Sequence, residues 1–369
     1  MPGHRSFKDV IERDYYNTIF DALSDQVECC SDRLDLSTRR VEAPEYAELS
    51  DIDIEAVYVC DKGGLAIEFD VIVSAEITVS KHYGSNVETD EAEQWFSVTC
   101  SGELEDGLQK FKIGGISPYS RVRFEKEGRL TDTFVPVISK GSLDDEATAF
   151  LEAYYPDALK EPMALPVREV AARMGLAIRE ASLSQYFTVF GMMVFGDSPV
   201  LCFDHDAQSY KEMDVKRGTI LVDPDVFFLR NLGCWNNTVI HECFHWHRHR
   251  KHYELTKMYK PDDALITCRV DEKARPKPAE RKWRDCDWIE WQANSVAPRI
   301  LMPKDMTLVK IDEFRRIRRE VMACPCREGH RLSQRRCFFP YSKTAPLRHF
   351  RIIAAKTHRL FPVGNAEGL

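Results

Sequence analysis

Apolar and polar residues alternate along residues 67–79 of this 369-residue chain. Every odd position in this stretch is apolar, and every even position except Ile72 is polar. An alternation with a period of two predicts a β-strand that buries one face and exposes the other. Shorter strands are expected at 54–60, 95–101, 108–113 and 134–138, with a turn at Gly63 and Gly64.

A helical pattern precedes these strands. Between residues 7 and 29, apolar side chains recur on one helix face: Phe7, Val10, Ile11, Tyr15, Ile19, Leu23 and Val27. We therefore expect residues 1–140 to form an N-terminal helix plus a β-rich domain. No cluster of residues in this part indicates chemistry, so its role, regulatory or substrate-binding, stays open.

The second half carries the strongest chemical signal, the pentapeptide His241-Glu242-Cys243-Phe244-His245. In a helix, His241 and His245 differ by about 40° in direction and about 6 Å in height, so both imidazoles face one side. This spacing lets both bind one Zn²⁺ and places Glu242 where it can take a proton from the attacking water. The alternative is a buried amphipathic helix with two incidental histidines. An apolar stripe predicts that the helix packs into a core: Leu232, Trp235, Val239, Cys243 and Trp246.

His249 offers a competing pair, because it stands four residues after His245. One ion cannot reach all three histidines, since His241 and His249 would lie about 12 Å apart along the helix axis. We interpret residues 245–252 as the solvated, basic end of the helix, where cations complement the helix dipole.

A catalytic zinc site needs a third protein ligand. The metzincin arrangement would place a glycine and a histidine where this chain has Arg248 and Lys251, so that arrangement is excluded. A second helix predicted within 287–303 presents one face of suitable residues: Glu290, Ala293, Asn294, Ala297 and Leu301. Its alanines permit close approach to the histidine helix, which makes Glu290 the candidate third ligand.

The pairing of His-Glu-x-x-His with Glu-x-x-Ala-Asn-x-x-Ala-x-x-Ile-Leu-Met-Pro resembles the ImmA/IrrE family of bacterial metallopeptidases. Residues 165–178 look like that family's opening helix and strand, and residues 191–196 and 219–223 look like its small sheet. The resemblance covers roughly residues 143–305. It implies zinc on His241, His245 and Glu290, with Glu242 as the general base and Asn294 supporting the ligands.

Two features depart from the family pattern. Pro298 lies inside the second helix, where it removes the backbone hydrogen bond to the Asn294 carbonyl and is expected to kink the helix. The interval between His245 and Glu290 contains polar, proline-bearing stretches at 261–263 and 273–280, which predict a surface insertion. Both features affect the shape of the cleft and leave the ligands in place.

The composition is typical of an intracellular enzyme. The first ten residues are polar and no segment approaches about 18 consecutive apolar residues, so we expect a cytoplasmic protein without a membrane span. In that setting the 12 cysteines are interpreted as reduced thiols, with Cys243 in the core. Cys324, Cys326, His330 and Cys337 could imitate a second zinc site, although their spacing matches no standard knuckle.

The C-terminal segment differs from the rest in charge. Residues 310–369 hold 14 Lys or Arg against 5 Asp or Glu, within a chain of net charge −8. Such asymmetry can indicate an arm for nucleic acid or an acidic partner. Residues 324–369, however, lack helical periodicity and a helix-turn-helix pattern, and a late change of reading frame would also produce such a segment. The leading interpretation is a poorly ordered basic tail at 311–369.

These features together predict an α+β protein in which residues 141–310 form a zincin-like, ImmA/IrrE-like metallopeptidase domain. The expected activity is zinc-dependent hydrolysis of a peptide bond, with the substrate extended along the strand near 219–222. The resemblance implies a protein substrate, a helix-turn-helix transcriptional repressor, cut in a stress or mobile-element response. The alternative is a zinc-containing regulatory or binding protein with little or no proteolytic activity.

Overall fold

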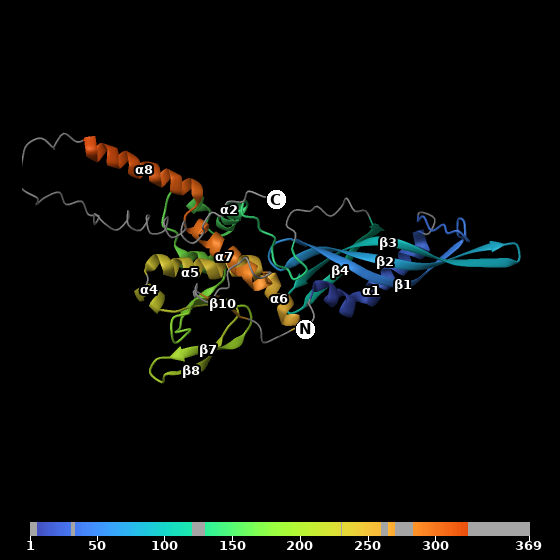
Figure 1. Ribbon diagram of the computed structural model, residues 1–369, viewed down its shortest axis with the longest axis horizontal. Coiled ribbons are helices and arrows are strands. Elements are labelled where there is room, and N and C mark those ends of the chain that lie inside the picture. The colour runs from blue at the N-terminus through green and yellow to red at the C-terminus, as the bar shows by residue number, and fades with distance from the viewer. Residues whose placement is uncertain are drawn as a thin grey trace, which may run out of the picture. The chain divides into compact units, whose positions relative to one another are not determined.

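The structure is a computed structural model, and it describes residues 6–30, 34–119, 130–229, 231–259, 265–269 and 283–323. It is a mixed α+β protein with a strand-rich N-terminal region and several helices in the C-terminal half (Figure 1). The strands are β1 (Tyr46–Asp61), β2 (Ala66–Tyr83), β3 (Asn86–Leu104), β4 (Leu108–Pro118), β5 (Ala177–Glu180), β6 (Val189–Val194), β7 (Ser198–Asp204), β8 (Ser209–Val215), β9 (Thr219–Val222) and β10 (Leu265–Arg269). The helices are α1 (Phe7–Cys30), α2 (Leu143–Tyr154), η3 (Pro156–Leu159), α3 (Val167–Arg173), α4 (Asp225–Leu229), α5 (Leu232–Phe244), η4 (His245–His249), α6 (Arg250–Tyr259), α7 (Asp285–Leu301) and α8 (Lys304–Ala323).

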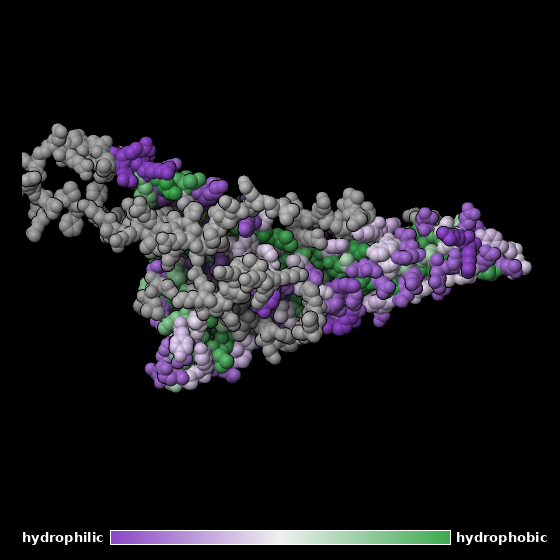
Figure 2. Space-filling view, viewed as in Figure 1, coloured by the Kyte–Doolittle hydropathy of each residue, from purple (hydrophilic) through white to green (hydrophobic). Residues whose placement is uncertain are grey.

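The N-terminal sheet consists of four antiparallel strands in the order β1-β2-β3-β4. The odd-numbered residues of β2 from Ile67 to Val79 are all buried, as their alternation predicts, and α1 contributes Phe7 and Leu23 to the same core. The side chains visible over these strands are mainly hydrophilic (Figure 2). The predicted helix at 7–29 and the strands at 54–60, 67–79, 95–101 and 108–113 are confirmed, and every strand is longer than predicted.

The turn between β1 and β2 is also confirmed. Gly63 and Gly64 have φ angles of +79° and +54°. These left-handed conformations carry no steric penalty for glycine. The two glycines therefore allow the chain to reverse tightly into the central strand.

The strand predicted at 134–138 is wrong. Phe134 has a φ of +63°, which interrupts an extended conformation, and only an isolated bridge joins Leu130 to Pro136. The side chain of Phe134 is nevertheless fully buried, and its ring centroid lies 4.7 Å from that of Phe7. Phe134 therefore fills the N-terminal core from a loop, whereas Ile138 joins the C-terminal core and Val137 is exposed. A local apolar pattern does not distinguish such a loop from a strand.

The C-terminal half contains a second sheet in the order β10-β6-β9-β5 and a separate hairpin of β7 and β8. β5 and β9 are parallel, whereas β6 pairs antiparallel with both β9 and β10. The segments at 191–196 and 219–223, predicted to form a small sheet, correspond to β6 and β9. The β7–β8 hairpin was not predicted.

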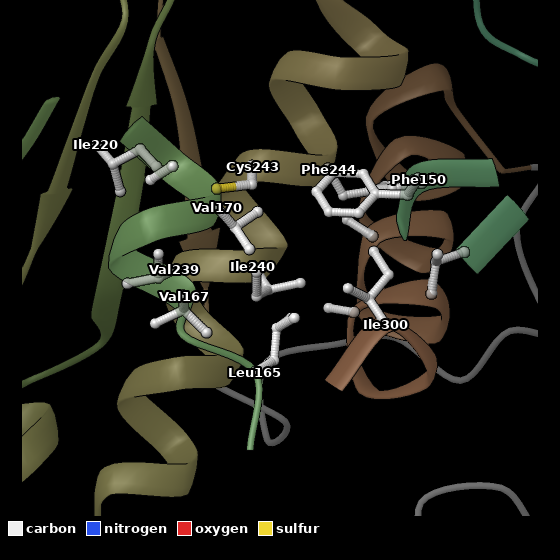
Figure 3. Close-up of a cluster of buried hydrophobic side chains, with 14 of the residues drawn as sticks. Phe150, Leu165, Val167, Val170, Ile220, Val239, Ile240, Cys243, Phe244 and Ile300 are labelled. Carbon is white, nitrogen blue, oxygen red and sulfur yellow. The ribbon is translucent and has the colours of Figure 1, made fainter. Parts of the chain in front are cut away.

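One apolar core holds the C-terminal helices against this sheet (Figure 3). Val170 of α3 and Ile220 of β9 pack with Val239 of α5, and Phe244 of α5 packs with Ile300 of α7 on the other side. All five side chains are fully buried. This core fixes α5 between the sheet and α7.

The chain divides into two compact units, Met1–Ile311 and Asp312–Leu369, and the division falls inside α8. Because α8 continues to Ala323, the first part of the predicted tail at 311–369 is helical. The remainder, 324–369, lies outside the described residues, as do the Cys324 cluster and the predicted insertion at 261–263 and 273–280. Of the helices that the structure describes, none combines the length and the apolar character needed to cross a membrane.

Candidate metal centre

The pentapeptide of His241 to His245 spans the last turn of α5 and the start of η4. α5 begins after Asn231, whose side-chain oxygen accepts a hydrogen bond of 2.8 Å from the backbone N–H of Cys234. Such a cap satisfies one of the unpaired N–H groups of the first helical turn. Further along, most of the predicted apolar stripe lies in the core, Cys243 included, although Leu232 is exposed.

The segment after His245 is not the solvated helix end predicted for residues 245–252. It forms the π-helical segment η4 and then α6, in which His249 is fully buried and Lys251 is only 4% exposed. The prediction is wrong because these polar side chains find partners far away in the sequence, such as Asp61 and Gln292. A local pattern does not contain those partners. π-helical turns often occur at functional sites.

The structure brings together the three residues predicted as metal ligands. The Nε2 atoms of His241 and His245 are 2.8 Å apart. The Glu290 carboxylate oxygens lie 3.5 Å from His241 Nε2 and 3.4 Å from His245 Nε2. The potential ligand atoms of the three residues all lie within 4.8 Å of one another, so this group could hold a metal ion.

The donor set fits a zinc ion. Ligands at zinc-binding distances around a tetrahedral centre are about 3.3–3.6 Å apart, which agrees with the Glu290 distances and requires the two imidazoles to separate by about half an ångström. Both Glu290 oxygens are buried without a hydrogen-bond partner in the described part of the chain. Buried polar atoms normally have partners, so these free lone pairs suit a cation.

The protonation states also suit metal binding. Burial pushes the pKa of Glu290 up, but its contacts with His241 and His245 outweigh that effect and lower the pKa below its ordinary value. Burial and the neighbouring His241 lower the pKa of His245. The site therefore favours a carboxylate beside a neutral imidazole, which are the forms in which these groups bind metals.

Glu242 is completely buried beside the three ligands. Neither of its oxygens has a hydrogen-bond partner among the described residues. Burial and the charge of Glu290 raise the pKa of Glu242 well above its ordinary value. A buried, unpaired carboxyl group costs free energy, and such a perturbed group is typical of a functional site.

Gly191 of β6 packs directly against Glu242. A Cβ atom at this position would lie 2.5 Å from Thr238 Cγ2 and 3.0 Å from Glu242 Oε1. The absence of a side chain therefore lets the strand approach α5 at the carboxyl group. Gly191 was not predicted as a site residue, and its only signal in the sequence is a glycine inside a predicted strand.

The glutamate helix α7 continues through Pro298 to Leu301. Asn294 is half-buried on this helix, and its predicted support of the ligands stays a prediction. Gln292, also on α7, forms a hydrogen bond with a histidine outside the ligand set, with its Oε1 atom 2.8 Å from His249 Nε2. His249 Nδ1 in turn lies 3.0 Å from His245 Nδ1. His249 and Gln292 were missed as site residues, because neither belongs to the motif.

The predicted substrate position along the strand near 219–222 is wrong. β9 is paired with β6 on one side and with β5 on the other. An extended peptide adds to a sheet only at a free edge, where backbone N–H and C=O groups are unpaired. Within the described residues, the outer strands of this sheet are β5 and β10.

No protein-family model, no curated protein and no solved structure matches this chain. The functional interpretation therefore depends on the residues of the site itself.

Proposed function

We propose that this chain is a zinc-dependent endopeptidase that hydrolyses a peptide bond in a protein substrate. The observation that carries the proposal is the meeting of His241, His245 and Glu290, with the buried and unpaired Glu242 beside them. Catalytic zinc sites use three protein ligands and leave a fourth position for water or substrate, whereas structural sites usually take four protein ligands.

The residues would divide the chemistry as follows. A zinc ion held by His241, His245 and Glu290 would polarise the scissile carbonyl and lower the pKa of water. Glu242 takes the proton of the attacking water and passes it to the nitrogen of the leaving amine.

The likeness of the two helical motifs to the ImmA/IrrE metallopeptidases supports a zincin-like domain at 141–310. The same likeness suggests the substrate, a helix-turn-helix repressor cut in a stress or mobile-element response. Neighbouring genes give a practical starting point, since a small helix-turn-helix protein encoded beside this chain would be the first substrate to try.

A second candidate function has one observation in its favour. His241, Glu242 and His245 are all completely buried, and Glu290 is the one candidate ligand that is partly exposed, so a protein substrate has little access to the site. This burial suits a zinc-containing regulatory or binding protein with little or no proteolytic activity.

Metal content tests the ligand set. We expect about one zinc per full-length chain after gentle purification, as a single three-ligand site requires. Elemental analysis should show the zinc lost in His241→Ala, His245→Ala and Glu290→Ala. It should be retained in His247→Ala, because His247 Nδ1 contacts the Tyr154 hydroxyl and not the ligands. Normal zinc content in Glu290→Ala would contradict the assignment.

Cleavage separates the two candidate functions. The full-length protein should be incubated with the helix-turn-helix protein encoded beside it. We expect new protein termini, identified by mass spectrometry, that disappear with a chelator and return with added Zn²⁺. Bound zinc without cleavage of this or other neighbouring gene products would favour the regulatory candidate.

A further inference from the structure

A series of buried hydrogen bonds runs behind His245, on the side away from the other ligands. His245 Nδ1 lies 3.0 Å from His249 Nδ1, and His249 Nε2 lies 2.8 Å from Gln292 Oε1. Gln292 Nε2 donates to the backbone carbonyl of Pro136 at 2.7 Å. His245, His249 and Gln292 are each at most 2% exposed, so water does not compete for these bonds.

The proton positions in this series follow from its last member. The Pro136 carbonyl can only accept a hydrogen bond, so the amide nitrogen of Gln292 must face it and the amide oxygen must face His249. An amide oxygen also only accepts, so His249 Nε2 must carry its proton. In the neutral ring the other nitrogen is then bare, and His249 Nδ1 accepts from Nδ1–H of His245.

The same reasoning fixes the metal-facing atom of His245. With its proton on Nδ1, neutral His245 presents a bare Nε2 atom, which lies 3.4 Å from the Glu290 carboxylate and 2.8 Å from His241 Nε2. A bare imidazole nitrogen is the form that binds a metal. His241 has no equivalent support, because its Nδ1 is buried without a partner among the described residues.

We propose that His249 and Gln292 are positioning residues that hold His245 in its metal-binding tautomer and orientation. This inference rests on the proposed metal site. Metal-binding histidines commonly donate their second N–H to a carboxylate or a carbonyl, which fixes the ring. Here the acceptor of that hydrogen bond is a neutral histidine, His249. His249 lies in the π-helical segment η4, which also contains the ligand His245.

The geometry also removes the alternative in which His249 binds a metal. Both of its ring nitrogens are used, one by His245 and the other by Gln292. His249 therefore has no nitrogen free for a second ion. The sequence allowed His245 and His249 to bind one metal ion as a pair. In our proposal His245 is the ligand and His249 holds it in position.

The first test needs no metal. The metal-free, full-length protein with ¹⁵N-labelled histidine should show His245 protonated at Nδ1 and His249 protonated at Nε2 in long-range ¹H–¹⁵N NMR spectra. His249→Leu should lose the fixed Nδ1–H tautomer of His245. A wild type with His245 protonated at Nε2 would overturn the inference, whether or not the protein binds zinc.

The second test is zinc affinity, measured by competition with a chelator. Loss of such a supporting partner typically weakens metal binding about 10–100-fold, which we expect for His249→Leu and Gln292→Leu. His249→Asn should restore most of the affinity, because its amide oxygen can take the place of Nδ1 as acceptor. His247→Leu is the matched control in η4 and should bind zinc as the wild type does, since His247 contacts Tyr154.

The outcomes separate the two proposals. Unchanged zinc affinity in His249→Leu and Gln292→Leu would overturn the positioning role and leave the metal site intact. Equal weakness in His249→Asn and His249→Leu would show that ring packing, not the hydrogen bond, matters. A wild type that binds no zinc would overturn the metal site, while the NMR measurement would still decide the tautomer.

Discussion

The N-terminal sheet and the C-terminal half bury different kinds of side chain. The core around β1–β4 and α1 is almost entirely apolar, and its buried Asp70 accepts a hydrogen bond of 2.7 Å from Thr99. The C-terminal half also buries a set of charged and polar residues: His241, Glu242, His245, His249, Lys251, Glu254 and Gln292. Burial of apolar surface stabilises a fold, whereas burial of a polar group costs free energy unless it is paired. The core of the N-terminal sheet therefore mainly stabilises the fold. The helices around α5 contain buried polar groups that lower stability and form the candidate metal site.

The buried polar groups of the C-terminal half are of two kinds. His249, Gln292 and Lys251 have partners within the chain. The carboxylate oxygens of Glu242 and Glu290 form no hydrogen bond with the described residues, and those of Glu290 lie 3.4 and 3.5 Å from the imidazole nitrogens of His245 and His241. Paired groups fix the shape of the site, and the unpaired ones are where a ligand or a reaction would compensate the cost of burial.

Glu242→Gln should have the largest effect on activity. It should show that Glu242 acts in catalysis and is not needed for zinc binding or for stability. Glutamine keeps the size of the side chain but cannot take up the proton, so cleavage should fall about 10²–10⁴-fold, the usual contribution of a general base. Zinc content should be unchanged. The thermal midpoint of the metal-free protein should not fall, because glutamine keeps the size and an acceptor oxygen of the glutamate side chain and carries no charge. Wild-type cleavage rates would mean that another group is the base.

The N-terminal sheet and the meeting of the three candidate ligands were predicted from the sequence, because both follow from local spacing. The alternation along β2 gives the buried face directly, and the four-residue interval between His241 and His245 places both rings together. Glu290 was found because its own helix carries a recognisable pattern. These predictions needed only residues that are neighbours in the sequence.

The rest of the site depends on contacts between distant segments. The solvated end predicted for residues 245–252 is instead partly buried, with His249 and Lys251 inside, because Asp61, Gln292 and the Thr133 carbonyl supply partners for its side chains. The strand expected at 134–138 failed for a similar reason, since Phe134 leaves the extended conformation to fill a core formed by other segments. Polarity and hydrophobicity indicate what a residue needs, but not which segment provides it.

Phe69→Ala tests whether the core of the N-terminal sheet affects stability alone or also the candidate metal site. Phe69 is fully buried against Phe7, with ring centroids 5.0 Å apart. Removing such a side chain leaves a cavity and should lower the free energy of unfolding by about 3–5 kcal/mol, measured by denaturant titration. Zinc affinity at a temperature where the variant is folded should equal that of the wild type. Weaker zinc binding under those conditions would show that the sheet core holds the metal centre in shape.

Asp61→Asn tests the charge pairs by which β1 contacts the helical segment after the candidate metal ligands. Asp61 bonds to Lys251 and, at 2.9 Å, to Arg248. The variant leaves Lys251 without its partner and Arg248 with Glu146 alone, at 3.1 Å. We expect a cost of about 3 kcal/mol in free energy of unfolding near pH 7, the low end for buried pairs because Asp61 is partly exposed. The double variant Asp61→Asn/Lys251→Met should recover part of that loss.

The pH dependence of the same variant has a definite sign. Burial raises the pKa of Asp61, but Lys251 outweighs it and lowers the pKa below the ordinary value of 3.8. The stabilisation by the Asp61 carboxylate is therefore present above pH 3.8 and lost as the pH falls through the lowered pKa. The difference in stability between wild type and Asp61→Asn should shrink in that acidic range. A constant difference from pH 7 to pH 2 would contradict the pairing.

The smallest expected effect comes from one added methyl group in each region. Gly191→Ala places a Cβ against Thr238 and Glu242, and such overpacking should cost about 1–3 kcal/mol in free energy of unfolding. Gly115 in β4 is the matched control, because a Cβ there meets nothing within 4 Å. Gly115→Ala should be neutral or stabilise by about 0.5 kcal/mol, since alanine loses less backbone freedom on folding.

Gly191→Ala should also reduce cleavage, because the added methyl displaces the Glu242 carboxyl group, while Gly115→Ala should cleave at the wild-type rate. Equal stability and equal cleavage in the two variants would show that β6 can move away from α5 without cost, and that the close approach at Gly191 does not position the base.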